Sequence, residues 1–536
     1  MPADLLIVNA RVRTLDPERP FADAVAVRDG IIVAVGDQAS VREEAGGADE
    51  VVDLRGAALV PGLVDAHTHP FHGTDIARGV DLRGARDFAE VRRRLEAGVA
   101  ALRDGEWLLA ANAYYEPFAE TGLRAEVLDA IAGGRPAVVR FFDAHTVLAG
   151  RGALAAAGID GPREFIQRAE VVCDADGRPT GELREWAAIG LLDRAVPRPA
   201  DPLAEYAATL RAMNANGLTG TQVMLGRPGL FDDIDGLEQS GRLSLRLRVP
   251  VWLQPETTDE EVEAYLAQRD RGGRRWVAGT AKFFGDGVIE TGTAWLHGGD
   301  ANGRNEQPFW PVPGSYEARV RQMAEAGFQC ITHAVGDGAV RAALDAYAAA
   351  PRAASGAPHR IEHLETLRDE ELGRLAAEGV AASMQPLHMM GLEQHDAEAR
   401  WPAAVGEQRL RLGFRWADVR RSGAVLALGS DWPVADHDPR AGMAWARLRR
   451  APCDREGTPF FAEQALTGLQ ALEGYTTHAA LAAGEQDVAG RIAPGFRADL
   501  TALAEDPVEC DADDLPAVPV VLTVVDGEVV FRGDGA

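Results

Sequence analysis

Lysine is almost absent from this chain of 536 residues: Lys282 is the single lysine among 55 basic residues. Basic residues are outnumbered by 82 Asp and Glu, which gives a formal net charge of −27. A surface this acidic repels phosphate groups, so we expect neither nucleic-acid binding nor binding to anionic membranes. Every other cation of the chain is an arginine, and Lys282 therefore needs an explanation of its own.

Cysteines and long apolar runs are also scarce. The four cysteines show no CxxC spacing, which excludes a disulfide framework and a cysteine-rich zinc site. No stretch of 18 apolar residues occurs, so no transmembrane helix is expected. The N-terminus lacks a basic start and is broken early by Asp4 and Asn9, which predicts a strand rather than a signal peptide. We therefore expect a cytoplasmic protein.

Both ends of the chain are rich in β-branched residues. Asp29-Gly30 and Asp526-Gly527 separate short apolar runs, and such pairs are typical of two-residue hairpin turns. We predict one small β-sandwich domain built from residues 1–60 and 481–536. Two unrelated hairpins are the alternative.

The middle of the chain, residues 61–480, alternates apolar strand-like runs with Ala/Leu/Arg/Glu-rich helical stretches. This alternation predicts an α/β fold, a TIM-like (β/α)8 barrel with its active site at the C-terminal ends of the strands. A subdomain at about 72–205 is inserted after the first barrel strand, where we expect it to cover the barrel mouth. The predicted strands are 63–69, 217–225, 245–253, 279–287, 329–335, 360–365, 379–387 and 424–432.

The strongest local motif is Asp65-Ala66-His67-Thr68-His69. Residues i and i+2 of a strand point to the same side, so the two imidazoles would face the barrel axis together. Two imidazoles so placed can bind one metal ion. Taken alone, the pair could also be packed or solvent-facing histidines.

Three further polar residues end predicted barrel strands: His333, His363 and Asp431. Singly, the histidines could be hydrogen-bonded core residues and Asp431 a helix N-cap. Together they would converge on one barrel mouth, where each unpaired buried polar group costs about 1–3 kcal/mol. A shared metal centre satisfies them jointly.

Lys282 lies on the predicted strand at 279–287. An ammonium group cannot bind a cation, but a deprotonated lysine amine can add carbon dioxide and form a carbamate with carboxylate-like oxygens. Arginine cannot do this because its guanidinium stays protonated. An ordinary ion pair to Asp286 or Glu290 is the alternative.

The ordered motifs VPGLVDAHTHP, AKFFGDG, ITHAVGD, RIEHLE, SMQPLH and LGSDWPV resemble the amidohydrolase superfamily. More narrowly, they resemble amidohydrolase family 3, the group of N-substituted formamide deformylases and YtcJ-like proteins. The resemblance covers nearly the whole chain and implies a metal-bearing barrel beside a small β-sandwich. It implies metal ligands at His67, His69, Lys282 as a carbamate, His333, His363 and Asp431.

The resemblance also implies an activity: hydrolysis of a non-peptide C–N bond in a small amide, N-formyl or N-acyl compound. The cofactor would be one or two divalent metal ions, with zinc expected, that activate a hydroxide, and Asp431 would be the catalytic proton shuttle. His363 or His388 would hold the developing oxyanion. The expected substrate contacts are His145, Trp295, Gln385, His388 and Trp432, although packing is the alternative for the aromatic residues. A homodimer is possible for this family.

Other functions stay open at this point. A cyclic amidohydrolase or a deaminase could use the same scaffold, although mononuclear deaminase sites do not need Lys282. A lactonase or phosphotriesterase-like esterase uses similar ligands. A non-catalytic barrel scaffold is disfavoured because such proteins are expected to lose ligands, and this chain keeps the whole set.

Overall fold

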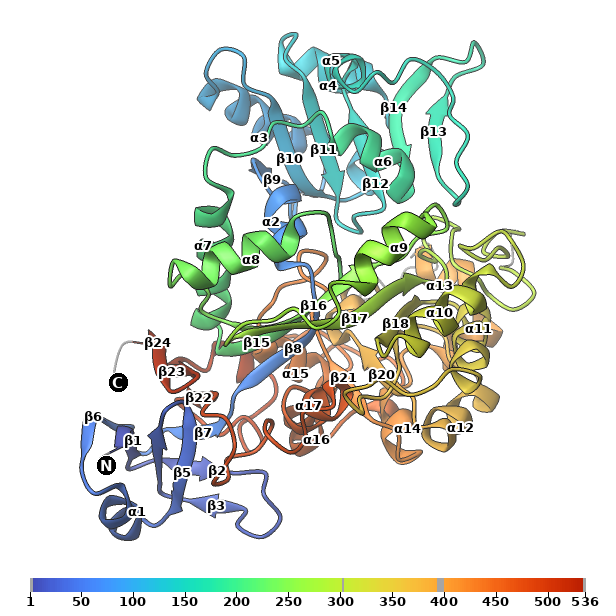
Figure 1. Cartoon of the computed structure of the whole chain (residues 1–536). Coiled ribbons are helices and arrows are strands. Elements are labelled where there is room, and N and C mark those ends of the chain that lie inside the picture. Colours follow the sequence, from blue (N-terminus) through green and yellow to red (C-terminus); the bar gives the residue numbers. More distant parts are fainter. Residues whose placement is uncertain (1–2, 301–302, 393–399, 534–536) are drawn as a thin grey trace. The chain divides into compact units, whose positions relative to one another are not determined.

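The computed structural model describes residues 3–300, 303–392 and 400–533 (Figure 1). The chain forms two compact units. One unit comprises residues 1–69, 206–308 and 312–536, and the other comprises residues 70–205 with 309–311. Each unit is described below by itself.

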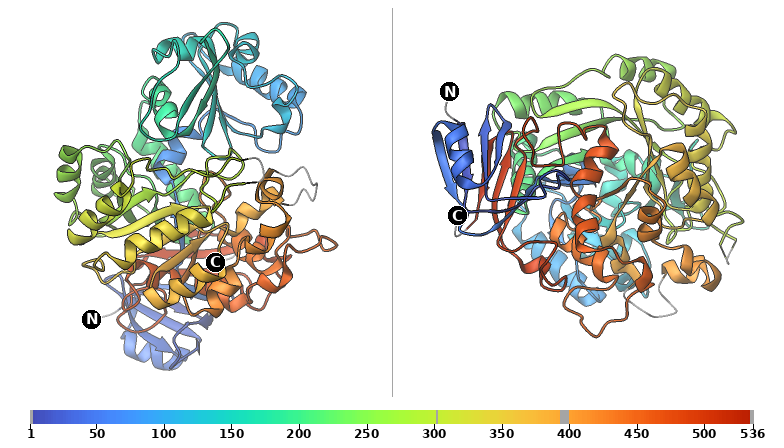
Figure 2. Two further views of the ribbon diagram at one scale, coloured as in Figure 1. Left: turned by 90° about the vertical axis from the view of Figure 1, so that its right-hand side faces the viewer. Right: turned by 90° about the horizontal axis from the view of Figure 1, so that it is seen from below.

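The larger unit contains the predicted barrel. Eight parallel strands follow one another in chain order around it, from the first to the last (Figures 1 and 2). The ring is nearly closed: the first and last strands share no ladder, and one bridge between Thr68 and Trp432 joins their ends. The fold class predicted from the sequence is thereby confirmed. The strands are β8 (Leu63–Thr68), β15 (Leu218–Val223), β16 (Arg246–Trp252), β17 (Trp276–Phe284), β18 (Gln329–Ala334), β19 (Arg360–His363), β20 (Ala381–Met384) and β21 (Leu426–Leu428).

Most of the barrel strands are buried on both faces. Every residue of β15, β18, β19, β20 and β21 is buried, as expected for parallel strands covered by helices. Helices α10 (Ser315–Glu325), α11 (Asp337–Ala348) and α12 (Asp369–Glu378) alternate with the later strands. Each strand therefore ends at the mouth of the barrel, where the next loop begins.

Residues from both termini form two further sheets. The first has the order β5-β4-β1-β6 and the second has the order β24-β23-β22-β7-β2-β3. Leu5 and Val25 of the first share one hydrophobic core with Leu59, Leu500 and Leu522 of the second. The strands are β1 (Ala3–Val8), β2 (Arg11–Arg13), β3 (Phe21–Ala22), β4 (Ala24–Arg28), β5 (Ile31–Gly36), β6 (Ala48–Asp53), β7 (Ala58–Pro61), β22 (Leu500–Leu503), β23 (Val520–Val525) and β24 (Glu528–Arg532).

Both predicted hairpin turns are present in these sheets. Arg28 pairs with Ile31 and Val525 pairs with Glu528, which leaves two residues in each turn. Asp29 and Gly30 have φ of 52° and 75°, and Asp526 and Gly527 have φ of 58° and 80°. Two central residues with positive φ form a type I′ turn, whose twist suits a hairpin.

The smaller unit is the insertion that follows the first barrel strand. It contains a six-stranded sheet of order β13-β14-β12-β11-β10-β9 with hydrophobic cores of its own. Helices α3 (Phe88–Ala101), α4 (Ala125–Ala132) and α6 (Glu185–Asp193) belong to it. Its strands are β9 (Val80–Asp81), β10 (Leu108–Ala113), β11 (Ala137–Phe141), β12 (Thr146–Ala149), β13 (Glu170–Cys173) and β14 (Pro179–Arg184).

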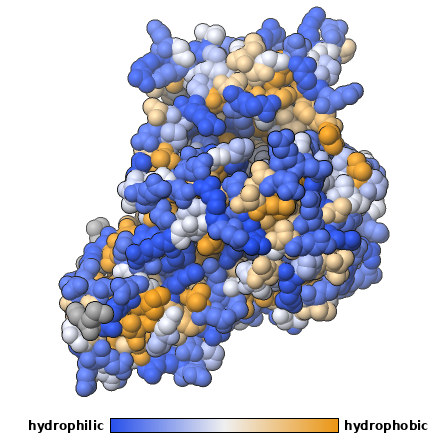
Figure 3. Space-filling model, in the orientation of Figure 1, coloured by the Kyte–Doolittle hydropathy of each residue, from blue (hydrophilic) through white to orange (hydrophobic). Residues whose placement is uncertain are grey.

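Hydrophilic residues cover most of the face drawn in Figure 3, with smaller hydrophobic areas between them. Among the described residues, none of the helices combines the length and apolar character that crossing a bilayer requires. This agrees with the sequence expectation on membrane spans.

Gly442 in α15 (Pro439–Leu448) provides a test of barrel packing. A Cβ atom at this position would lie 1.9 Å from Oη of the buried Tyr475. We expect Gly442→Ala to lower the free energy of unfolding by about 1–3 kcal/mol, because the buried ring has to move. Gly373 of α12 is the matched control, since it is exposed and has no atom within 4 Å of such a Cβ. Gly373→Ala should be stabilising by up to about 1 kcal/mol. Thermal unfolding measures the change in stability of both variants. Equal changes in Gly442→Ala and Gly373→Ala would contradict the prediction.

Candidate metal centre

His67 and His69 lie at the C-terminal end of β8, and Asp65 anchors this strand end. One carboxylate oxygen of Asp65, Oδ1, accepts hydrogen bonds from the backbone N–H of His67 and of Ser430, both at 3.0 Å. Burial raises the pKa of Asp65 to about 6. This carboxylate therefore links the first barrel strand to the segment after the last one, where no ladder joins them.

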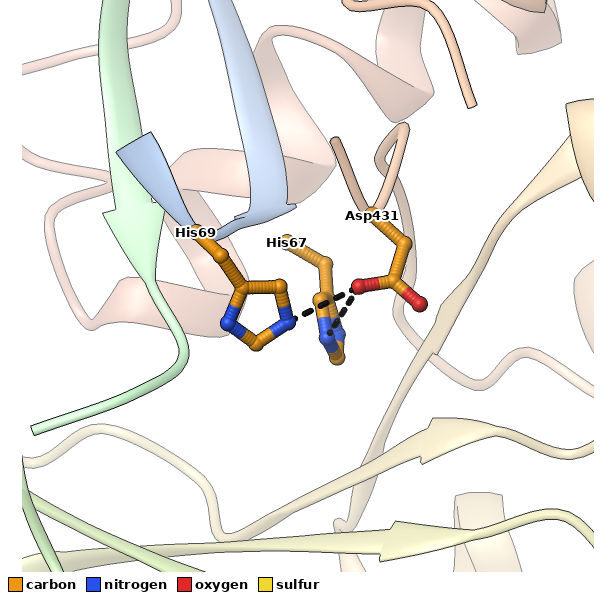
Figure 4. A group of neighbouring side chains, drawn as sticks. All are labelled: His67, His69 and Asp431. Carbon is orange, nitrogen blue, oxygen red and sulfur yellow. Dashed lines mark ion pairs between the residues drawn. The ribbon is translucent and has the colours of Figure 1, made fainter. Parts of the chain in front are cut away.

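Asp431 follows the last barrel strand and faces both histidines (Figure 4). Its Oδ1 lies 2.9 Å from Nε2 of His69 and 3.3 Å from Nε2 of His67. Potential ligand atoms of these three residues all lie within 4.8 Å of one another. Burial alone would raise the pKa of Asp431, but the two imidazoles outweigh it and hold the pKa well below its usual range. Asp431 is therefore an anion in the centre of the cluster.

The other histidines predicted at strand ends join the same cluster. The ring of His363 lies 4.7 Å from that of His67, 4.3 Å from that of His333 and 5.7 Å from that of His388, centre to centre. His363, His388 and Asp431 form a second group whose potential ligand atoms lie within 4.8 Å of one another. Burial and the neighbouring positive groups lower the pKa of His363 well below its usual value. A neutral imidazole is the form that binds metals.

Lys282 lies on β17 and is completely buried. Its Nζ has no hydrogen-bond partner among the described residues, and it lies 5.3 Å from the centre of the Phe284 ring. Burial lowers the pKa of Lys282 to about 8. The positive charge of Lys282 also contributes to lowering the pKa of the buried His69 and His363, which places it beside the histidines. The alternative ion pair to Asp286 or Glu290 is not among the ion pairs of the described residues.

His388 continues the cluster away from the twin histidines. Its Nε2 lies 3.4 Å from Oδ2 of Asp431, and its Nδ1 lies 3.5 Å from Oε1 of Glu365. The other Glu365 oxygen accepts a hydrogen bond from Nε1 of Trp401 at 2.8 Å. The two oxygens of Asp431 therefore have different neighbours: Oδ1 faces His67 and His69, whereas Oδ2 faces His388.

Glu362 is a site residue that the sequence reasoning missed. Its Oε2 lies 2.6 Å from Nδ1 of His67, and its Oε1 accepts from Nε of Arg360 at 2.5 Å. Burial would raise the pKa of Glu362, but Arg360 and His67 bring it down to about 2. A carboxylate on the far nitrogen fixes the tautomer and orientation of a ligating histidine.

The alternation of a regular strand does not predict that the adjacent side chains of Glu362 and His363 both face His67. Successive residues of a regular strand face opposite sides, yet both of these residues contact His67. His363 achieves this with φ of 74°, a left-handed conformation that breaks the alternation. Asp431 has φ of 59° and is also left-handed. Such backbone conformations in non-glycine residues cluster at functional sites.

Asp286 holds the loop beside His333. Its carboxylate accepts hydrogen bonds from the backbone N–H of Trp295, Val335 and Gly336 at 2.8–2.9 Å. Its Oδ1 lies 3.8 Å from Nε2 of His333, which also lies 3.1 Å from the carbonyl oxygen of Gly287. The indole of Trp295 lies against the start of α11, since a Cβ atom at Gly338 would lie 3.0 Å from its Cδ1.

The remaining predicted substrate contacts differ in their surroundings. Gln385 is buried after β20, and neither amide atom has a hydrogen-bond partner among the described residues. Trp432 is half-buried, and its carbonyl oxygen accepts from the backbone N–H of His69 at 2.9 Å.

His145 belongs to the inserted unit. Its Nδ1 lies 2.6 Å from Oε2 of Glu185, and both side chains are buried. Asp143 accepts from the backbone N–H of His145 at 3.0 Å and from Tyr115 Oη at 2.6 Å. Ala144 and Glu185 have φ of 60° and 64°. The sequence reasoning missed Glu185, although RPTGELREWA contains it.

A parallel barrel whose strand ends gather histidines and an aspartate around one point defines the class of metal-dependent barrel hydrolases. Within this class, the chain belongs to the amidohydrolase family. The model of that family, amidohydrolase family 3, matches residues 50–531.

Known proteins agree with this membership. YtcJ of Bacillus subtilis is 25% identical over 548 residues, covering 97% of this chain and 98% of YtcJ. The N-substituted formamide deformylase of Arthrobacter pascens is 27% identical over 566 residues, covering 99% of each protein. An uncharacterized metal-dependent hydrolase from Pyrococcus horikoshii has the same fold, with a TM-score of 0.74 and 23% identity, covering 95% of this chain and 99% of that one.

Glu362→Gln tests the support that His67 receives. We expect divalent-metal affinity to fall about 10–100-fold, because the amide cannot stabilise the N–H of His67 as the carboxylate does. Metal titration of the metal-free protein measures the affinity. Circular dichroism checks that the barrel stays folded when the buried Arg360 loses its carboxylate partner. Glu370→Gln is the control, since Glu370 is exposed on α12. Unchanged metal affinity in a folded Glu362→Gln variant would contradict the role.

Proposed function

We propose that this protein is an amidohydrolase that hydrolyses the C–N bond of a small N-formyl or N-acyl amine. The observation that carries the proposal is the grouping of His67, His69 and Asp431 within 4.8 Å at the barrel mouth. The similarity to an N-substituted formamide deformylase over 99% of both chains supports this bond type.

The donor set fits a divalent metal ion, for which we propose zinc. His69 Nδ1, His363 Nδ1 and Lys282 Nζ are buried and have no hydrogen-bond partner among the described residues. Imidazole and carboxylate groups in this combination suit zinc. We propose His67, His69, Lys282, His333, His363 and Asp431 as its ligands. When bound, such an ion acts as a Lewis acid and lowers the pKa of a bound water from 15.7 to about 7.

Lys282 would be a ligand only as a carbamate. As an ammonium group it has no hydrogen-bond partner among the described residues and no lone pair to donate to a metal ion. Its burial favours the neutral amine, which is the form that adds carbon dioxide. The proton lost in that reaction leaves to solvent or a neighbouring base, and the product carries one negative charge. This proposal explains why the chain keeps a lysine only here.

Asp431 would move the proton of the reaction. It is ionised, so it can accept a proton from the attacking water and pass it to the nitrogen of the departing amine. Oδ2 is the oxygen that lies near His388, which can orient it. His363 or His388 would stabilise the oxyanion, while Gln385, Trp295 and Trp432 would contact the substrate. The unpartnered amide of Gln385 is suited to a carbonyl or amine group of that substrate.

Assays with N-formyl and N-acyl amines test the activity. The zinc-loaded protein should release the amine, and Asp431→Asn should lower kcat about 10²–10⁴-fold, because the amide cannot accept the proton. Asp436→Asn is the control, since Asp436 is exposed five residues further on. Amine release measured by fluorescamine reports both variants. Turnover of esters or ring deamination in place of amide hydrolysis would overturn the proposal.

Substitution of Lys282 tests the carbamate. Lys282→Ala should lose most bound metal and turnover, and added acetate should restore part of both, because its carboxylate can replace the carbamate. Lys282→Arg should lose metal without rescue, since the guanidinium keeps its charge and occupies the space. Metal per chain is measured by plasma mass spectrometry. Full metal and activity in both variants would refute the carbamate.

A further inference from the structure

A cavity of about 130 Å³ lies at the N-terminal ends of β15, β16 and β17. It is bounded on its other sides by α17 (Thr477–Ala483) and by parts of the segment 485–499. The candidate metal centre lies at the opposite, C-terminal ends of the barrel strands, and β17 is the strand that contributes to both. The cavity is therefore a separate feature of the barrel.

Arginines dominate the wall of this cavity in a chain whose net charge is −27. The two carboxylates that line it are Glu485 and Asp499. The arginines are Arg246, Arg248, Arg274, Arg275 and Arg497.

Three of these arginines have a carboxylate of their own. Arg246 binds both oxygens of Asp499, at 2.8 and 3.1 Å. Arg274 pairs with Asp526, and Nη2 of Arg275 lies 2.6 Å from Glu528. Their charges are therefore compensated.

Arg248 and Arg497 share the carboxylate of Glu485. Nη2 of Arg248 and Nη1 of Arg497 lie 3.4 and 3.2 Å from the same oxygen, Oε1. Nε of Arg248 is buried and has no hydrogen-bond partner among the described residues. Burial, together with the charges of Arg360 and Arg497, lowers the pKa of Arg248, although Glu485 opposes this. Two guanidinium groups thus face one carboxylate, and one positive charge is left over.

We propose that this cavity binds a small oxyanion, a phosphate or a carboxylate, between Arg248 and Arg497. A guanidinium has five N–H donors in a planar fork that fits two oxygens of such an anion. An anion between the two guanidinium groups would accept from their N–H donors and neutralise the charge that Glu485 leaves uncompensated. The low local polarity strengthens the interaction.

Calorimetric titration of the metal-loaded protein with inorganic phosphate tests the proposal, and acetate at matched ionic strength distinguishes the two anions. We expect saturable binding that weakens at least tenfold in Arg248→Met and in Arg497→Met. Arg274→Met is the control, since it removes the same charge from an exposed arginine that lines the cavity and is paired with Asp526; it should change binding less than twofold. Phosphate that binds at the metal centre would persist in all three variants.

Glu485→Gln should change the affinity for the oxyanion in the opposite direction. Removing the competing carboxylate should tighten oxyanion binding several-fold, whereas a purely structural ion pair would only lose stability. The absence of saturable binding of both anions to the unaltered protein would overturn the proposal. Binding that is unchanged in folded Arg248→Met, or weakened in Glu485→Gln, would overturn it as well.

Discussion

The barrel of this protein is completed by carboxylates where a hydrogen-bonded ladder is missing. β8 and β21 share no ladder; one bridge joins Thr68 to Trp432, beyond the end of β21, and the carboxylate of Asp65 accepts from the backbone of His67 and Ser430. The backbone N–H of Asp431 donates to the carbonyl oxygen of His67 at 2.7 Å. The seam of the barrel and the candidate metal centre are thus built from the same residues, so the closure of the fold also positions the ligands.

Most of the fold could be predicted from the sequence because its signals are local. Most of the barrel strands lie in short stretches rich in buried apolar residues, and such stretches are recognisable between amphipathic helices. The two Asp-Gly pairs specify type I′ turns, since few other residue pairs tolerate positive φ at both positions. The near closure of the barrel could not be predicted, because it depends on Asp65 reaching across to Ser430, 365 residues away in sequence.

The candidate site was predictable to a lesser degree. The spacing of His67 and His69 is a strand signal, and the grouping of these two with Asp431 follows from strand ends meeting at one mouth. Glu362 and Glu365 were not identified, because in sequence they read as ordinary neighbours of His363. The contact that Glu362 makes depends on the left-handed backbone of His363, because this turns the adjacent side chains of Glu362 and His363 toward His67. No periodicity encodes such a break.

The choice between lysine and arginine follows the chemistry at the two ends of the barrel. At the N-terminal end, arginines keep a permanent charge and are held by Asp499, Asp526 and Glu528, which suits rigid ion pairs. At the C-terminal end, Lys282 is completely buried beside the proposed ligands, and a side chain with a permanent positive charge there would oppose the binding of a metal ion. Only a side chain whose charge can be lost or reversed is compatible with that end. Lysine meets this requirement and arginine does not, so the scarcity of lysine elsewhere makes the position of Lys282 informative.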